Sequence, residues 1–260
     1  MKNKILVTLI FLLSCFCVIA EENTQDKLRK EMVTFGIRKD SIETYFAAAD
    51  EANDEGYIKL LEKAVKLDPK NYIALDDLGV TYANESNNEK AKDYYKQSIS
   101  INSKNPFPYV RLYEIYKGDE DYESAEKIAN DLTKYIPEHP EGYYELANLY
   151  YMDEEYEKSI NSIQVAIEKY KNLDTERFYE DAENRDSYLQ DAYYLLASNY
   201  YALYKDKEVI DIYLSQLDTM KKIEYGRIDD FRKIAIDANE SFKDSDKKYY
   251  EKNKKLLEAE

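Results

Sequence analysis

Tryptophan is absent from the 260 residues, histidine occurs once, and there are only six glycines and five prolines. With so few glycines, the chain holds neither a phosphate-binding glycine loop nor a dinucleotide-binding fingerprint. The single histidine, His139, lies in a turn between Pro137 and Pro140, where we expect it to be exposed and inert. Metal and catalytic sites need several converging groups. We therefore predict no metal, no cofactor and no enzymatic activity, although paired carboxylates alone stay compatible with catalysis.

Cysteine is also scarce, and both copies, Cys15 and Cys17, lie within the first 20 residues. Two lysines there precede an apolar run that is too short for a membrane-spanning helix. We expect residues 1–20 to be a signal peptide removed after Ala20. The protein is then exported, periplasmic or secreted, and lacks any thiol or disulfide. The alternative is a lipoprotein anchored through Cys15, because Leu12–Cys15 resembles a bacterial lipobox.

Positive charge is in deficit, since 37 lysines and arginines stand against 53 aspartates and glutamates, a formal net charge of −16. Such a field repels phosphate backbones and anionic lipid surfaces. We therefore expect no nucleic-acid partner, and membrane contact only through lipidation at Cys15. A protein or peptide with basic and aliphatic residues is the natural complement. Both signs of charge are mixed along the chain, which also suits an ordinary soluble surface.

Tyrosine is abundant, with 28 residues, and much of it recurs at a fixed period. Two sets of residues are spaced 34 apart, namely Leu78, Leu112 and Leu146, and Tyr82, Tyr116 and Tyr150. Within each period the apolar residues recur at i, i+3, i+4 and i+7, which predicts helices, and β-type alternation is absent after residue 21. A fixed period of this length indicates stacked copies of one supersecondary unit. We predict an all-α chain of helix hairpins.

Small residues stand where paired helices must approach closely, and large tyrosines fill the gaps beside them. The recurring positions are Leu78, Gly79, Tyr82, Ala91 and Tyr95 in one unit, Leu112, Tyr116, Ala125 and Pro137 in the next, and Leu146, Ala147, Tyr150 and Ala166 in the third. This pattern resembles the tetratricopeptide repeat family, as an exported bacterial member. It departs from the family in lacking tryptophan, in Ser103 for a terminal proline, and in Tyr113 for a small residue. The resemblance implies a right-handed α-α superhelix of about five helix hairpins plus terminal capping helices.

The register of the repeat slips once, because Leu146 and Leu196 are 50 residues apart, 16 more than the period. The extra segment is polar and strongly charged. In structure it is either a lengthened helix or an exposed loop. In function it is either a specific contact element or a tolerated surface insertion.

We divide the chain into residues 1–20 (signal peptide), 21–53 (N-terminal capping helices or a degenerate repeat), 54–172 (repeats), 173–189 (charged insertion), 190–223 (a further repeat) and 224–260 (C-terminal capping helices).

Carboxylates recur in step with the repeat, at residues 119–121 and 153–155. A calcium loop needs alternating oxygen ligands and a glycine, and neither segment has them. We expect these acids to cap free amides at the start of each second helix and to complement the helix dipole.

Tyrosines are doubled at 143–144, 150–151, 193–194 and 200–201, so one ring of each pair lies about 100° around the helix from the packing face. In the tetratricopeptide repeat family, the first helix of each unit lines a concave groove that receives a peptide. The resemblance therefore implies a partner-binding groove lined by Ile73, Asp76, Val80, Phe107, Val110, Arg111, Glu114, Tyr144, Asn148, Tyr151, Tyr194, Ser198 and Tyr201. Acidic residues on that surface, Asp76, Glu141 and Glu145, argue against the family's basic clamp for a terminal carboxylate.

These observations predict a non-catalytic protein–protein interaction scaffold that binds a polypeptide in a tyrosine- and carboxylate-lined groove, in envelope assembly. Tyrosine suits such a surface because it combines apolar area with a polar tip, although the same rings could pack against the neighbouring repeat. Two alternatives stay open. One is a carbohydrate-binding protein or hydrolase using the same groove, which needs two carboxylates roughly 5–10 Å apart. The other is a lipid-anchored subunit of an outer-membrane complex, which depends on Cys15.

Overall fold

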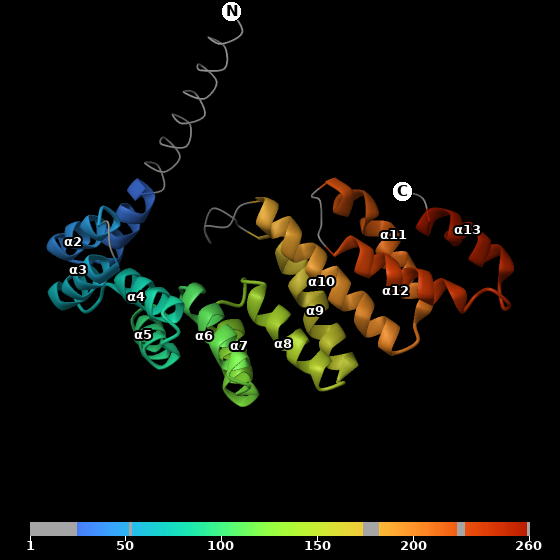
Figure 1. Cartoon of the computed structure of the whole chain (residues 1–260), viewed down its shortest axis with the longest axis horizontal. Helices are drawn as coiled ribbons and strands as arrows, with labels where there is room; N and C mark the ends of the chain where they lie inside the picture. Colours follow the sequence, from blue (N-terminus) through green and yellow to red (C-terminus); the bar gives the residue numbers. More distant parts are fainter. Residues whose placement is uncertain (1–24, 52–53, 174–181, 223–226, 259–260) are drawn as a thin grey trace, which may run out of the picture. The chain divides into compact units, whose positions relative to one another are not determined.

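The computed structural model describes residues 25–51, 54–173, 182–222 and 227–258 (Figure 1). All regular structure in these ranges is helical, which confirms the predicted all-α fold class. The helices are residues 25–35, α2 (Lys39–Ala49), α3 (Asp54–Leu67), α4 (Tyr72–Asn84), α5 (Asn88–Ile101), α6 (Phe107–Gly118), α7 (Tyr122–Tyr135), α8 (Glu141–Met152), α9 (Tyr156–Lys171), α10 (Ala182–Ala202), α11 (Asp206–Lys222), α12 (Ile228–Glu240) and α13 (Lys247–Leu257). Within the described ranges, none of the helices combines the length and the apolarity that a membrane crossing requires. The predicted signal peptide lies outside these ranges.

The chain divides into two compact units, Met1–Asn102 and Ser103–Glu260, which we describe separately. The division falls at Ser103, where the repeat lacks its terminal proline. In the first unit α2 packs against α3 and α4 against α5. The segment 21–53 therefore supplies α2 as the first helix of a hairpin.

The first unit is held by a close helix contact and by a buried polar network. A Cβ on Gly79 would lie 2.7 Å from Cδ1 of Tyr95 and closer still to Cε1, so α4 and α5 approach at a position that only glycine fits. Nearby, Oγ of Ser41 donates to the carbonyl of Ala64 at 2.6 Å and accepts from Nδ2 of Asn71 at 3.0 Å. Oδ1 of Asn71 in turn accepts from the amide of Ala74 at 3.1 Å and caps α4. The network joins the first hairpin to the start of the next.

The second unit repeats the same hairpin four times, as α6–α7, α8–α9, α10–α11 and α12–α13. One hydrophobic cluster joins α8, α9 and α10 through residues such as Ala147, Ile163 and Ala192. A second cluster joins α10 through α13, with Tyr213 and Phe231 fully buried. Phe231, Ala235 and Ala238 of α12 therefore form a packing face.

The turns inside four hairpins, α4–α5, α6–α7, α8–α9 and α10–α11, share one backbone conformation. Ser86, Glu120, Glu154 and Tyr204 have φ between 55° and 60°, the left-handed region that non-glycine residues seldom adopt. Their spacing of 34, 34 and 50 residues repeats the sequence period and its single slip. Asp121 caps α7 by accepting from the amide of Ser124 at 3.1 Å, as expected. The equivalent Glu155 makes no side-chain cap, because its longer side chain suits that position less well than aspartate.

The charged insertion forms, in part, a lengthened helix. Residues 174–181 lie outside the described ranges, and α10 begins at Ala182, inside the segment predicted to be inserted. The added N-terminal part of α10 carries Tyr188, which lines the cavity described below.

Candidate binding site

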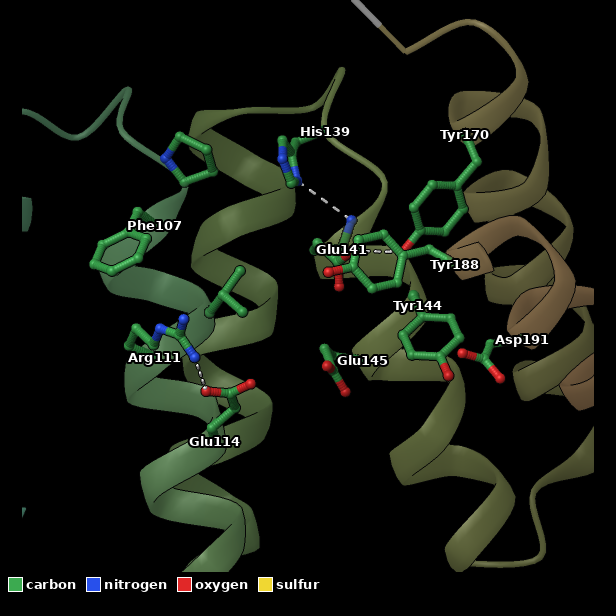
Figure 2. A pocket seen from close by; sticks show the side chains of 12 residues that line it. Phe107, Arg111, Glu114, His139, Glu141, Tyr144, Glu145, Tyr170, Tyr188 and Asp191 are labelled. Carbon is green, nitrogen blue, oxygen red and sulfur yellow. Dashed lines mark hydrogen bonds and ion pairs between the residues drawn. The ribbon is translucent and has the colours of Figure 1, made fainter. Parts of the chain in front are cut away.

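A cavity of about 330 Å³ lies among α6, α8, α9 and α10 of the second unit (Figure 2). The lining side chains come mainly from the first helices of three consecutive hairpins. They are Pro106, Phe107, Val110, Arg111, Glu114, His139, Glu141, Tyr144, Glu145, Tyr170, Tyr188 and Asp191. We call this the tyrosine–carboxylate cavity.

Proline fixes where two of the lining helices begin. Pro106 and Pro140 occupy the residue before α6 and before α8, with φ of −71° and −70°. Proline is tolerated there because its missing N–H would have no partner inside the helix. Phe107 is therefore the first residue of α6 and Glu141 the first residue of α8, at equivalent positions 34 residues apart. Both side chains line the cavity.

Three tyrosines form the aromatic wall. The Tyr170 ring, only 1% exposed, lies 6.4 Å from the Tyr144 ring and 6.2 Å from the Tyr188 ring, measured between centroids. The hydroxyl of Tyr170 donates to Oε1 of Glu141 at 2.5 Å. Burial and the neighbouring Glu141 carboxylate both raise the pKa of Tyr170, so this hydroxyl keeps its proton and acts as a donor.

Carboxylates supply most of the charged groups that line the cavity. Arg111 pairs with Glu114 at 2.9 Å on α6, while Glu141, Glu145 and Asp191 come from α8 and α10. Burial raises the pKa of Glu145 to about 7, because a carboxylate shielded from water loses hydration of its charged form. Lys117 and the side chains of Tyr113 and Asn148 oppose this shift by favouring the charged form. Glu145 therefore titrates near neutral pH.

The expectation that His139 is exposed is wrong, because its side chain is only 4% accessible and lines the cavity. The turn folds back on α7, where the amide of His139 donates to the carbonyl of Ile136 at 3.0 Å. Nδ1 of His139 accepts from the amide of Glu141 at 3.4 Å, at the start of α8 (Figure 2). His139 thus orders the entry to α8. Among the residues that the structure describes, no three or more histidine, cysteine, aspartate or glutamate side chains are arranged to hold a metal ion.

A second cavity, of about 460 Å³, lies between α10 and α12. Tyr194 and Tyr201 line it from α10, and the hydroxyl of Tyr201 donates to Oδ2 of Asp237 on α12. Ile236 is 37% exposed there, beside Asp230, Lys233 and Glu240. α12 is again the first helix of its hairpin, so this cavity continues the pattern of the first.

The predicted groove residues separate into three groups. Phe107, Val110, Arg111, Glu114 and Tyr144 line the first cavity, and Tyr194 and Tyr201 line the second. Asn148, Tyr151 and Ser198 are half-buried on the same helices, but their side chains bond or pack within their own hairpin. Nδ2 of Asn148 donates to the carbonyl of Tyr144 at 3.3 Å, Oγ of Ser198 donates to that of Tyr194 at 2.9 Å, and the Tyr151 ring packs against Tyr156 at 5.7 Å.

In the first unit the predicted groove residues lie on α4 and are less accessible than expected. Ile73 is buried in a core cluster with Met32 and Ile42, and is 8% exposed. Asp76 is 5% exposed, and Val80 is half-buried. The helix formed by residues 25–35 supplies Met32 to the cluster that buries Ile73, from a segment that the repeat period does not include. Ile73 and Asp76 are therefore largely inaccessible to a partner in the groove predicted for them.

The predicted groove surface included Glu141 and Glu145 but not Pro106, His139, Tyr170, Tyr188 or Asp191, which also line the first cavity. Asp191 stands three residues before Tyr194 on the same helix face, as Glu141 stands before Tyr144, so the spacing could have included it. Tyr188 lies in the insertion, where the period no longer assigns a face. Tyr170 belongs to a second helix, which the groove hypothesis assigned to packing.

Comparison with known proteins supports the fold. No protein-family model matches the sequence, and no curated protein matches it. A similar solved structure is the APC/C hetero-tetramer Cut9–Hcn1, with a TM-score of 0.54 and 14% identity over 92% of this chain and 46% of that one. The MamA protein gives a TM-score of 0.48 with 16% identity over 79% of this chain and 93% of MamA. A tetratricopeptide-repeat protein of Thermus thermophilus gives 0.43 with 20% identity over 71% and 89%.

At these identities the likeness concerns the fold alone, and the Cut9–Hcn1 similarity extends over nearly all of this chain. This likeness accompanies the helix-hairpin order of the described residues. The chain has a tetratricopeptide-type helix-hairpin fold.

Proposed function

We propose that the protein is a non-catalytic scaffold that binds a segment of a partner polypeptide along the first helices of the second unit. The observation that carries this proposal is the recurrence of cavities on those helices, first among α6, α8 and α10 and then between α10 and α12. Both cavities combine tyrosine rings with carboxylates, so one chemistry extends across consecutive hairpins. An extended segment that places basic or aliphatic side chains in successive cavities matches this arrangement.

Exposed aromatic side chains support the same proposal. Phe107 and Tyr201 are each 36% exposed at the two cavities. Aromatic residues at the centre of an interface often contribute much of the binding free energy, because they bury a large area at a small cost in rotamer entropy. The proposed setting is the cell envelope, on the basis of the predicted signal peptide at residues 1–20.

A peptide selection tests the proposal. A random peptide library is selected on the immobilised protein, and the affinity of the enriched peptides is measured by fluorescence anisotropy. We expect enrichment of lysine, arginine and aliphatic residues. The variants Phe107→Ala and Tyr201→Ala should weaken binding about fivefold or more, which corresponds to about 1 kcal/mol.

Tyr122→Ala is the matched control, because Tyr122 is 43% exposed on α7, a second helix. It should leave the affinity unchanged. Enrichment of acidic peptides, or equal loss of affinity in all three variants, would refute the proposed groove.

A second candidate function is glycoside hydrolysis, favoured by one observation. Glu145, with a pKa of about 7, lines the same cavity as Glu141 and Asp191. A carboxyl group with a raised pKa close to a second carboxyl group is the arrangement that many glycosidases use for acid–base catalysis. A panel of chromogenic glycosides tests this candidate. Turnover that is lost in Glu145→Gln would establish it, and no turnover in the wild type would reject it for the sugars tested.

A further inference from the structure

We infer that the tyrosine–carboxylate cavity is a recognition site for an organic cation, namely an alkylammonium or guanidinium group. The inference refines the proposed function by naming what this cavity takes, either from a side chain of the bound segment or from a free amine. Two features of the cavity carry it, the aromatic wall and the excess of carboxylates.

The aromatic wall suits a cation that carries apolar carbons. Tyr144, Tyr170 and Tyr188 stand with their ring centroids 6.2 and 6.4 Å apart across Tyr170, and Tyr188 is 39% exposed. A cation within about 6 Å of a tyrosine centroid is attracted by the negative face of the ring, and alkyl groups pack on the same surface. Cavities enclosed by several aromatic rings are a recurrent solution for ammonium ligands.

The charge of the lining favours a cation as well. Four carboxylates, Glu114, Glu141, Glu145 and Asp191, face the cavity, and Arg111 and His139 are the basic side chains among its lining residues. Arg111 is paired with Glu114 at 2.9 Å, and Arg227 lies 3.7 Å from Asp191. Four carboxylates against one arginine among the lining residues still give the cavity wall an excess of acidic groups. The carboxylates would repel an anionic ligand, and a neutral ligand would gain no charge–charge attraction from them.

The chain itself provides an example of this recognition at the neighbouring position. The guanidinium of Arg227 lies 4.3 Å from the centroid of the Tyr194 ring and 3.7 Å from Oδ1 of Asp191. A tyrosine and a carboxylate separated by three residues on α10 thus hold a guanidinium between them. Glu141 and Tyr144 have the same three-residue spacing on α8, and both face the cavity.

Glu145 makes binding dependent on pH. A bound cation stabilises the charged form of Glu145, so binding releases a proton wherever this group is protonated beforehand. The groups that face Glu145 are Tyr113, Glu114 and Lys117 on α6, Tyr170 on α9, and Tyr144 and Asn148 on its own helix. Of these, Lys117 already supplies part of the compensating charge.

The volume of the cavity limits the size of the ligand. At about 330 Å³ it lies near the lower end of small-molecule sites, which range over roughly 300–1,000 Å³. A single lysine or arginine side chain, or a short linear amine, matches this volume.

Titration by ¹H–¹⁵N NMR tests the inference, with the full chain and four probes. The cationic probes are n-butylamine, 1,4-diaminobutane and lysine blocked at both ends as an acetyl methylamide. The neutral control is n-butanol. We expect saturable shifts of the amides of Tyr144 and Tyr188 with the three cationic probes, and at least fivefold weaker binding of n-butanol. Binding of n-butylamine should strengthen about fivefold from pH 6 to pH 8.

Two variants separate a site from a general surface effect. Glu145→Gln should weaken n-butylamine binding about fivefold or more at pH 8 and remove its dependence on pH. Tyr188→Leu should weaken it without altering the fold, because Tyr188 is partly exposed on α10. The matched controls are Glu157→Gln and Tyr122→Leu, on exposed positions of α9 and α7.

Each result has a defined consequence. Tighter binding of blocked lysine than of the diamine assigns the site to a partner side chain, and the reverse assigns it to a free amine. The absence of saturable shifts, or equal binding of n-butanol, overturns the inference. If the selected peptides still bind while the amines do not, the inference fails and the proposed function stands. If the amines bind and no peptide is selected, the proposed function fails instead.

Discussion

The hydroxyl of Tyr170, near the end of α9, donates a 2.5 Å hydrogen bond to the carboxylate of Glu141, the first residue of α8. The bond closes the α8–α9 hairpin at its open end, opposite the turn that contains Glu154. It also holds the Tyr170 ring against Tyr144 and Tyr188. One contact therefore stabilises the hairpin and shapes the wall of the tyrosine–carboxylate cavity.

Tyr170→Phe tests this contact. The variant keeps the buried ring but removes the donor to a carboxylate, and hydrogen bonds to charged groups contribute about 1.5–3 kcal/mol. We expect the free energy of unfolding to fall by that amount in urea denaturation. Tyr122→Phe, at an exposed tyrosine of α7, should leave it unchanged. A Tyr170→Phe protein as stable as the wild type would show that the bond contributes nothing.

Gly79→Ala tests the close approach of α4 and α5. The added Cβ would meet the Tyr95 ring at 2.7 Å or less, and overpacking of this kind costs about 1–3 kcal/mol. Gly118→Ala is the matched control, because its Cβ would have no neighbour within 4 Å and alanine favours helix by up to about 1 kcal/mol. Thermal melts should move in opposite directions, and a lowered melting temperature in both would contradict the packing argument.

Glu154→Gly tests the repeated left-handed turn. Glu154 has φ of 58°, which costs an ordinary residue about 1–2 kcal/mol relative to glycine. Part of this gain is lost through the greater freedom of glycine in the unfolded chain, so we expect stabilisation of about 0.5–1 kcal/mol. Glu157→Gly, in the first turn of α9, should instead destabilise by a similar amount. The denaturation midpoint should rise in Glu154→Gly and fall in Glu157→Gly. Two shifts of the same sign would argue against strain at Glu154.

The pH dependence of stability tests the burial of Glu145. Its pKa is raised from 4.5 to about 7 on folding, so the folded state binds more protons than the unfolded state between these values. The free energy of unfolding must then decrease as pH rises through this window and level off above it. We expect Glu145→Gln to lose less stability than the wild type between pH 5 and pH 8, by about 1–3 kcal/mol. Identical pH profiles in urea denaturation would mean that Glu145 titrates normally.

The repeat period allowed most of the fold to be predicted, because each hairpin packs by the same local rule. Leu78, Leu112 and Leu146 recur in register and are all buried. Phe107, Tyr144 and Tyr194, which the spacing assigned to one surface, line cavities, since residues on one helix face share a neighbour; their role in partner binding stays a prediction. These features depend on positions a few residues apart, which the sequence displays directly.

The errors arose where burial depends on segments distant in sequence. Ile73 was expected to line the groove, but it is buried in one cluster with Met32 of the helix at residues 25–35. His139 was expected to be exposed, but it is buried in the turn between α7 and α8 and accepts a hydrogen bond from the first residue of α8. Tyr188 could not be assigned a face because the insertion interrupts the period. In each case the side chain is located by tertiary packing that a single-sequence period does not encode.

The most direct test of the proposed binding face is photocross-linking in the native cell. A benzoylphenylalanine residue replaces Phe107 in one protein, Tyr201 in a second and Tyr122 in a third, and adducts are identified by mass spectrometry. The account predicts that the Phe107 and Tyr201 positions cross-link to the same partner polypeptide and that the Tyr122 position does not. Adducts at Tyr122 alone, or equally at all three positions, would contradict a binding face on the first helices of the second unit.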